Sequence, residues 1–168
     1  MAEVIPDSLS TSENATNGEK RVFALLRDIL IPDEEYIVWY EPRVLRRYPD
    51  FLVWSQRFGL LAVEVKDWMA SQIRKMAPGS FDLEINGRIE QRTSPLAQVR
   101  DSSHMLMSAL KKVPSFLHTS GPHKDHIRFP VGYAVFWTNI SKAQAEEMGM
   151  SYVIPPELSF FQDDLRLD

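Results

Sequence analysis

Apolar residues recur along the chain at two spacings, one helical and one strand-like. An early run with apolar residues three and four positions apart ends at Pro32 and Asp33, which predicts a helix over residues 18–30. Ser94 as N-cap and Pro95 in the first turn predict a second helix over residues 95–113. Ser141 begins a shorter helical stretch. Three helices are therefore expected.

The strand-like runs lie between these helices. Three follow in succession, "YIVWYEP", "DFLVW" and "GLLAVEVK", and the short turn "SQRF" predicts that the last two form a hairpin. The stretch "FDLEINGRIEQ" alternates on both sides of Asn86 and Gly87, which predicts a second hairpin beside the main sheet. The run "VGYAVFWTN" is typical of a buried strand, and "YVI" at residues 152–154 is compatible with a last short one.

The order of these elements predicts the domain and its fold class. Residues 1–17 are polar and lack periodicity, which indicates a flexible N-terminal arm. Residues 18–168 are expected to form one domain in which helices pack on both faces of a mixed sheet, a three-layer α/β/α fold.

Composition narrows the class of protein. The chain lacks cysteine, opens on no signal-like segment and has no apolar run of membrane-spanning length, so we expect a cytoplasmic protein without a membrane partner. The net charge of -4 argues against coating nucleic acid by bulk electrostatics. Between Glu41 and Lys75, however, seven basic and four acidic side chains give a local charge of +3.

Three charged residues of the basic stretch are expected to meet at one end of the first hairpin. Because side chains alternate along a strand, Glu64 and Lys66 share a face and lie roughly 6.5–7 Å apart. Asp50 has the same parity as Leu52, and a turn centred near Arg57 places Asp50 opposite Glu64. The hairpin therefore brings two carboxylates and one ammonium group together.

Such a trio suits phosphodiester cleavage. Two adjacent carboxylates repel unless a cation lies between them, and hard oxygen ligands favour Mg²⁺ or Mn²⁺. Lys66 would position the attacking water and bind the phosphate. The alternative is an ordinary solvated hairpin face, on which such charges have no catalytic role. The apolar residues on the same face, Leu52, Trp54, Leu60 and Ala62, favour a site instead.

The motifs "RYPDF" and "LLAVEVKDW" resemble the PD-(D/E)XK nuclease signature and, more specifically, the nuclease-related domain known as NERD, which has the restriction-endonuclease-like fold. The segments "GEKRVFALL", "SPLAQVR", "GYAVFWTN" and "FFQDDL" resemble later parts of that family in the family's order. The "RYPDF" variant is similar to NERD regions that precede a superfamily 1, UvrD-like helicase module. No helicase motif is present here, which indicates either a fragment or a stand-alone relative.

The resemblance implies roles for particular residues. Asp50 and Glu64 match the metal-binding carboxylates, Lys66 matches the catalytic lysine, and Val65 would contribute a backbone carbonyl to the metal. Glu19 matches an acid of the first helix that completes the site. The sequence "TNGE" also forms a capping box, in which Glu19 would only bond back to the backbone of Thr16.

Further residues are candidates for contacts with nucleic acid. Arg46 and Arg47 precede Asp50 and are plausible phosphate contacts, with a solvated turn as the alternative. Trp68 is the tryptophan expected to face a substrate. Gln98 resembles a helix glutamine that borders the active site in exonuclease-like relatives, but Ser102 stands where they often carry tyrosine, which leaves an exposed polar role open for Gln98.

One other cluster could bind a metal. His118, His123 and His126 fall within nine residues, but neither cysteine nor a flanking carboxylate pattern accompanies them, so a zinc site is not expected.

These observations together predict a Mg²⁺- or Mn²⁺-dependent nuclease domain that acts on DNA, in DNA repair or processing linked to a helicase. Two alternatives stay open: a catalytically silent module that binds or targets nucleic acid, and an enzyme directed at RNA, because no residue separates ribose from deoxyribose.

Overall fold

The structure is a computed structural model that describes residues 3–9, 14–31, 35–43, 46 and 48–165 of the 168-residue chain. At its centre is a mixed sheet of six strands in the order β1-β2-β3-β4-β8-β9. The strands are β1 (Glu3–Ile5), β2 (Tyr36–Tyr40), β3 (Phe51–Ser55), β4 (Gly59–Lys66), β8 (Val131–Trp137) and β9 (Ser159–Phe161). The β3–β4 pair is antiparallel, as predicted; the β2–β3 pair is also antiparallel, and the other pairs of this sheet are parallel.

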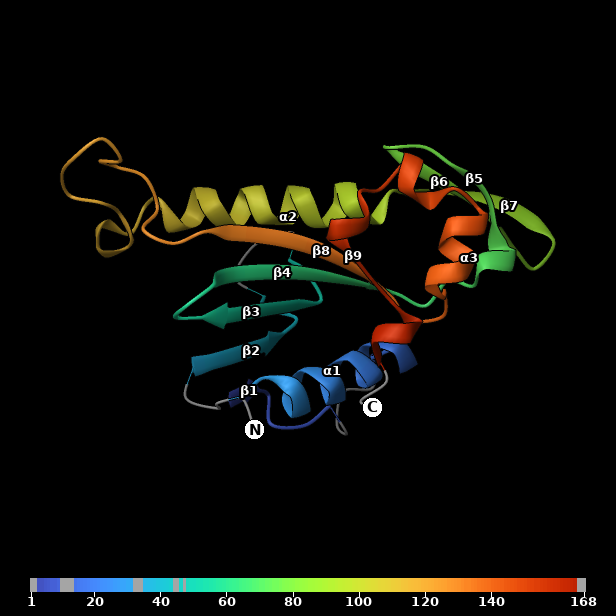
Figure 1. The fold of residues 1–168 in the computed structure, drawn as a ribbon, viewed down its shortest axis with the longest axis horizontal. Coiled ribbons are helices and arrows are strands. Elements are labelled where there is room, and N and C mark those ends of the chain that lie inside the picture. Colours follow the sequence, from blue (N-terminus) through green and yellow to red (C-terminus); the bar gives the residue numbers. More distant parts are fainter. Residues whose placement is uncertain (1–2, 10–13, 32–34, 44–45, 47, 166–168) are drawn as a thin grey trace.

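The helices cover both faces of this sheet. Helix α1 (Asn17–Ile29) lies on one side of it and helix α2 (Pro95–Leu110) runs along the other (Figure 1). Alternation along β4 divides the core accordingly: Val63 and Val65 belong to the cluster around α1, whereas Leu60 and Ala62 belong to the cluster around α2. The predicted three-layer α/β architecture is confirmed. The face of β4 that carries Glu64 therefore lies under α2.

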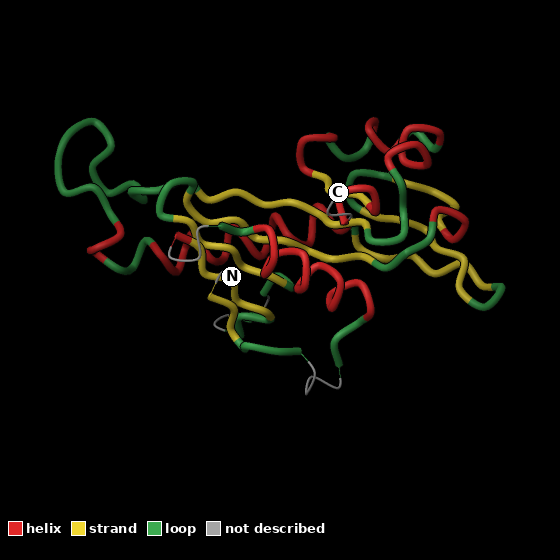
Figure 2. The backbone as a smooth tube through the Cα atoms, turned by 60° about the horizontal axis from the view of Figure 1, so that its bottom comes forward, coloured by secondary structure: helices red, strands yellow, loops and turns green. Residues whose placement is uncertain are grey.

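A second sheet of three strands extends the molecule at one end. It contains β5 (Ile73–Met76), β6 (Ser80–Ile85) and β7 (Arg88–Thr93). The predicted turn at Asn86 and Gly87 is confirmed, since both residues have positive φ, 52° and 75°. Strand β5 was not predicted, because Arg74 and Lys75 interrupt its apolar pattern. The loop over residues 111–130 lies at the opposite end of the molecule (Figure 2).

Helix α2 ends earlier than the predicted residue 113. The N–H groups of Lys112 and Val113 bond to carbonyls three residues back, and Val113 has extended backbone angles. Pro114 explains the change, because a proline disfavours helical geometry in the residue before it. Ser141 caps helix α3 (Lys142–Glu147), as predicted.

The predicted N-terminal arm contains regular structure. Strand β1 pairs in parallel with β2, and Val4 and Leu9 are buried in the cluster around α1. The description as a flexible arm is therefore wrong for residues 3–9. The apolar residues in this segment are too few to show a period, and only Val4 and Leu9 are buried, whereas Ile5 is exposed.

The predicted strand at residues 152–154 is also wrong. Gly149, with φ of 69°, turns the chain into a 3-10 helix at Met150–Tyr152, and Tyr152 is 92% exposed. The last strand is β9, where Phe161 is buried instead. Further 3-10 helices are Ala70–Gln72, Pro114–Phe116, Pro156–Leu158 and Gln162–Leu165.

The helices in the described part of the chain were also compared with the requirements of a membrane span. None of them combines the length and the apolar composition needed to cross a bilayer.

Candidate active site

The β3–β4 hairpin places Asp50 beside the end of β4. Its register pairs Phe51 with Val63, which continues the alignment that was expected for Asp50 and Glu64. The Asp50 carboxylate accepts a hydrogen bond of 2.7 Å from the backbone N–H of Val65. The backbone carbonyl of Asp50 accepts one of 2.8 Å from the backbone N–H of Glu41, the residue that follows β2. Asp50 is thereby fixed from both neighbouring strands, β2 and β4.

Glu64 and Lys66 form an ion pair on the same side of β4. Lys66 Nζ donates to Glu64 Oε1 at 2.7 Å. Glu64 is only 1% exposed, and its second oxygen, Oε2, has no hydrogen-bond partner among the described residues. A solvated hairpin face would expose this carboxylate, so that alternative does not describe the site. A buried carboxylate oxygen without a hydrogen-bond donor lowers the stability of the fold, so its presence points to a role other than packing.

The pKa values of both carboxyl groups are raised. Burial is the largest cause for Asp50, followed by the charge of Glu64, and together they raise its pKa to about 8 from 3.8. Burial also raises the pKa of Glu64, and Lys66 opposes that rise. A cation bound between two such acids would favour their ionised forms and relieve the repulsion between them.

Glu19 caps helix α1. Its Oε2 accepts hydrogen bonds from the backbone N–H of Thr16 at 3.0 Å and from the hydroxyl of Tyr40 at 2.8 Å, so the predicted capping box is confirmed. The charge of Glu19 also raises the pKa of Asp50 and of Glu64, which places it near both. Within the described residues, however, no three acidic, histidine or cysteine side chains converge closely enough to hold a metal ion. A ligand role for Glu19 stays a prediction.

The position of Glu19 depends on how α1 is anchored. The N–H of Gly18 donates to Asp67 Oδ2 at 2.9 Å, and Asp67 in turn accepts from the Thr138 hydroxyl. Asn139 donates to the carbonyl of Asp67 at 2.8 Å. This network ties the start of the helix to the residues that follow β4 and β8.

Replacing Gly18 by alanine is expected to break this anchor. A Cβ at Gly18 would lie 1.6 Å from Asp67 Oδ1 and 2.7 Å from Thr138 Oγ1, so the helix start has to move. Overpacking of this kind costs about 1–3 kcal/mol, measured as the loss in the free energy of unfolding. The matched control is Gly79→Ala, because a Cβ there has no neighbour within 4 Å. Equal stability of the two variants would contradict the anchor.

Gln98 reaches the site from α2. Its side chain favours the ionised form of Glu64 and so lowers that pKa, which places the amide beside the carboxylate. Arg46 is exposed on the loop before Asp50, and Arg43 pairs with Glu41 at 2.9 Å. Arg47 lies outside the described residues.

Trp68 packs against the core and is only partly buried, so its predicted contact with a substrate stays a prediction. Its ring packs against Phe81 and Trp137, at centroid distances of 5.8 and 6.1 Å, and is partly buried in the core. Lys66 Nζ lies 5.7 Å from the centroid of the same ring. This contact falls within cation–π range, so the ring helps to hold the lysine. The Val65 side chain is buried toward α1, and only its backbone reaches the site.

The three histidines of the loop at residues 111–130 lie near one another. The rings of His118 and His126 lie 6.1 and 6.2 Å from that of His123, centroid to centroid, and no three histidine, cysteine or acidic side chains among the described residues converge into a metal-binding group.

Sequence reasoning missed three contributors to the site. Tyr40 shares the parity of Val38 on β2, which could have indicated that it faces α1. Asp67 directly follows Lys66, and Tyr48 is part of the quoted "RYPDF" motif, so position alone could have marked both.

Comparison with known proteins adds one match. A family model described as NERD, nuclease-related domain, matches residues 15–138, a span that contains Glu19, Asp50, Glu64, Lys66 and Gln98. No curated protein and no solved structure matches the chain.

Proposed function

The chain belongs to the nuclease-related domain family, and from this premise we propose that it is a metal-dependent deoxyribonuclease. One observation carries the proposal. Asp50 and the buried Glu64 meet at the end of β4 beside Lys66, and Glu64 keeps one oxygen without a hydrogen-bond donor among the described residues. The two carboxylates are the kind of oxygen ligand that a hard divalent cation prefers, and the ammonium group beside them can bind a phosphate.

The residues fit Mg²⁺ or Mn²⁺. Both carboxyl groups have a raised pKa, and Glu64 Oε2 offers a buried acceptor. Asp50, Glu64 and the carbonyl of Val65 would hold the ion, a small set that suits a cation which keeps several waters. When bound, the ion supplies neutralisation of the phosphate charge and lowers the pKa of a water.

The protein's own groups supply position and charge. The Val65 N–H fixes the Asp50 carboxylate, and the ion pair with Glu64 holds Lys66 at the open end of the strand. From there the ammonium group orients the attacking water and stabilises the charge that develops on the phosphate. Glu19, held by Thr16 and Tyr40, adds a third negative charge nearby.

The wider setting that we propose is DNA repair or processing linked to a superfamily 1 helicase. Its support is the resemblance of "RYPDF" and "LLAVEVKDW" to the PD-(D/E)XK signature in the NERD regions that precede such helicases. Of the basic residues between Glu41 and Lys75, Arg43 and Arg46 lie on the loop before Asp50, where they favour the approach of a polyanion to the site.

Cleavage of labelled DNA tests the proposal. The parent chain is incubated with single- and double-stranded DNA in Mg²⁺, in Mn²⁺ and in a chelator, and cleavage is expected only with metal. A chain that binds Mn²⁺ calorimetrically and DNA by fluorescence anisotropy, yet cuts neither form, would instead support the silent binding module.

A further inference from the structure

A polar pocket beside the carboxylates has no role in the hydrolysis described above. It has a volume of about 400 Å³. Its wall comes from three parts of the chain, the loop before Asp50, the end of β7 and helix α2. The lining residues are Arg46, Tyr48, Thr93, Gln98 and Ser102. Every one of them is polar or amphipathic, and none is acidic.

The pocket lies next to the candidate catalytic groups. Tyr48 stands two residues before Asp50, and Gln98 faces the carboxylate of Glu64. A molecule seated in the pocket would therefore border the bond that is cut.

The charges around the pocket favour an anion. Arg46 is exposed, and no carboxylate pairs with it among the described residues. Arg43, bonded to Glu41, lies close enough to Tyr48 for the tyrosine to raise its pKa further, although Glu41 is the larger cause. The guanidinium of Arg46, unpaired within the described part of the chain, can donate hydrogen bonds to a phosphate, and the phenol ring of Tyr48 offers a flat surface on which a base can stack.

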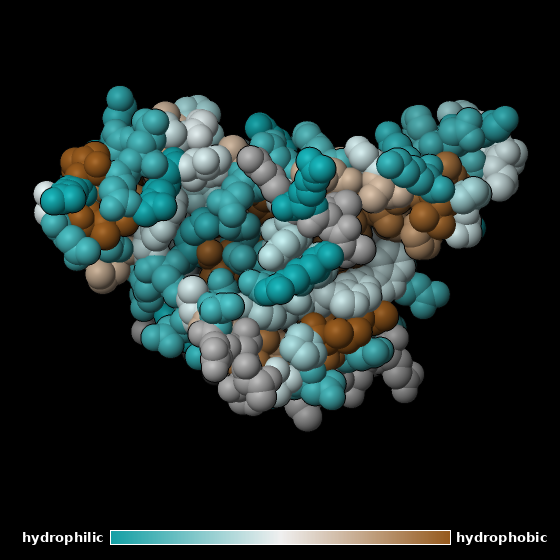
Figure 3. Space-filling view, turned by 180° about the vertical axis from the view of Figure 1, so that it is seen from behind, coloured by the Kyte–Doolittle hydropathy of each residue, from teal (hydrophilic) through white to brown (hydrophobic). Residues whose placement is uncertain are grey.

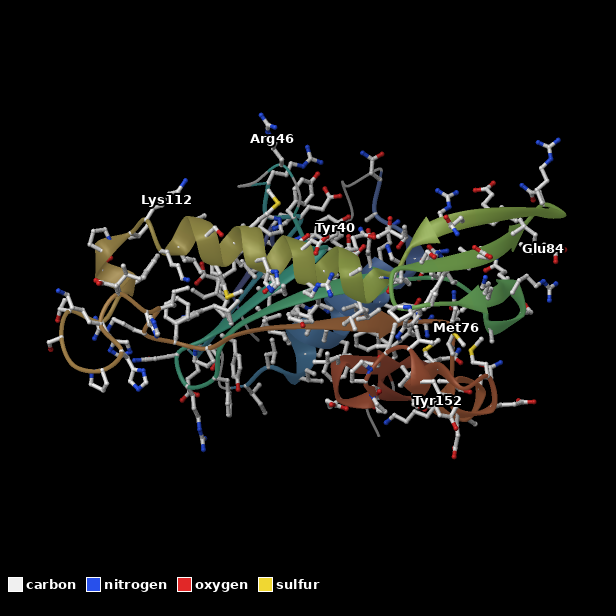
Figure 4. All side chains as sticks on the ribbon, turned by 90° about the horizontal axis from the view of Figure 1, so that it is seen from above. Tyr40, Arg46, Met76, Glu84, Lys112 and Tyr152 are labelled. Carbon is white, nitrogen blue, oxygen red and sulfur yellow. The ribbon has the colours of Figure 1, made fainter. Side chains whose placement is uncertain are left out.

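The surface on this side of the molecule is open to a polar ligand. Arg46 projects outward on the same side of α2 as Tyr40, away from Tyr152 and the C-terminal helices (Figure 4). The face turned that way carries mostly hydrophilic side chains across its middle, with apolar patches below them and at the sides (Figure 3).

We propose that this pocket binds a single unpaired nucleotide that flanks the scissile bond, with its phosphate on Arg46 and its base against Tyr48. Gln98 and Thr93 then supply hydrogen bonds to the sugar and base edges. A pocket of about 400 Å³ lies within the size range of small-molecule sites and is too small for a base pair with its two backbones. Resting on the proposed nuclease function, this inference narrows the substrate to single strands, flaps and frayed ends.

Binding measured without metal tests the inference separately from cleavage. The intact chain is titrated in a chelator against a short labelled single-stranded oligothymidylate and against a blunt duplex of matched length. Arg46→Ala and Tyr48→Leu are each expected to weaken binding of the single strand by about tenfold, whereas Tyr48→Phe, which keeps the ring, changes it by less than about threefold. The matched control is Arg57→Ala, at the turn of the β3–β4 hairpin and so at the other end from Asp50.

The outcomes separate the two proposals. Equal affinity for the duplex and the single strand, or unchanged binding by both Arg46→Ala and Tyr48→Leu with folding verified by circular dichroism, overturns the nucleotide pocket even when the parent cuts DNA. The expected losses in affinity establish the pocket even when no cleavage occurs under any metal condition, and in that case it is the proposed nuclease function that fails.

Discussion

Lys66→Met is expected to lower the rate of metal-dependent DNA cleavage by roughly 10²–10³-fold, the usual effect of removing one preorganised charge from a transition state. Methionine keeps roughly the length of the side chain but removes the ammonium group, which lies 2.7 Å from Glu64 Oε1 and 5.7 Å from the centre of the Trp68 ring. The fold should persist, because Lys66 is at the end of β4 and its backbone still bonds to Thr138. The measurement is the initial rate of cleavage at saturating Mn²⁺.

Lys66 also acts on Glu64, so the loss of rate has two possible origins. Among the groups that oppose the raised pKa of the Glu64 carboxyl, the lysine has the largest effect, and without it Glu64 holds its proton more tightly. A rate that recovers as Mn²⁺ or pH is increased would show that Lys66 only maintains the metal site. A rate that stays low under both changes supports the direct role.

Lys75→Met provides the matched control for this variant. Lys75 is exposed on β5, in the second sheet, and carries the same charge. The control should cut DNA at nearly the parent rate. Cleavage by Lys66→Met at the rate of this control would remove the lysine from the mechanism.

The arrangement of the two carboxylates could be predicted because a hairpin obeys simple rules. Side chains alternate along a strand, and the turn fixes the pairing, so the parity of Glu64 and its alignment with Asp50 follow from the positions alone. The burial of Glu64 could not be predicted in the same way. It depends on α2, which packs over that face from more than thirty residues further along the chain.

Other features were hidden for different physical reasons. Glu19 satisfies the pattern of a cap and of a site acid at once, and its contacts with Thr16 and Tyr40 show that one carboxylate can cap the helix while lying near the other acids. The pocket joins Tyr48 to Gln98 and Ser102, a proximity created by the packing of a loop on a helix. Residues 3–5 and 159–161 form edge strands too short to show a period.

The burial of Glu64 bears on whether the domain is active or silent. A structural role alone would leave a 1% exposed carboxyl with a raised pKa and an unpaired oxygen in the described part of the core, although leucine or methionine could fill the same space without that cost. The arrangement is easier to explain when a cation completes it. Metal binding would therefore separate a purely structural role from the other two possibilities, and cleavage would then separate an active nuclease from a silent module that binds metal.

Asp50→Asn is expected to stabilise the metal-free protein increasingly as pH rises, and to abolish both the stabilisation by Mn²⁺ and the cleavage of DNA. In the folded parent, the pKa of Asp50 is about 8, against an ordinary value of 3.8. Burial is the largest cause of this rise, and the charges of Glu64 and Glu19 add to it. The Val65 N–H and Lys66 oppose the rise. The stability linked to this group is therefore fully present below about pH 4, falls by about 1.4 kcal/mol per pH unit up to about pH 8, and is level above. Asparagine does not ionise, and its side-chain oxygen can still accept the Val65 N–H.

The measurement is chemical unfolding at several values between about pH 5.5 and pH 9, with and without Mn²⁺. The free-energy advantage of Asp50→Asn over the parent should widen up to about pH 8 and then stay constant. Metal at about a hundred times its dissociation constant should add about 2.7 kcal/mol to the parent and little to the variant. Asp28→Asn, an exposed carboxylate near the far end of α1, controls for the loss of one negative charge. Two results would mean that Asp50 and Glu64 do not share a cation site: a free-energy advantage of Asp50→Asn that does not change with pH, or equal stabilisation of both proteins by Mn²⁺. The reason is that the repulsion between the two carboxylates, which destabilises the metal-free protein, is the same repulsion that a bound cation relieves.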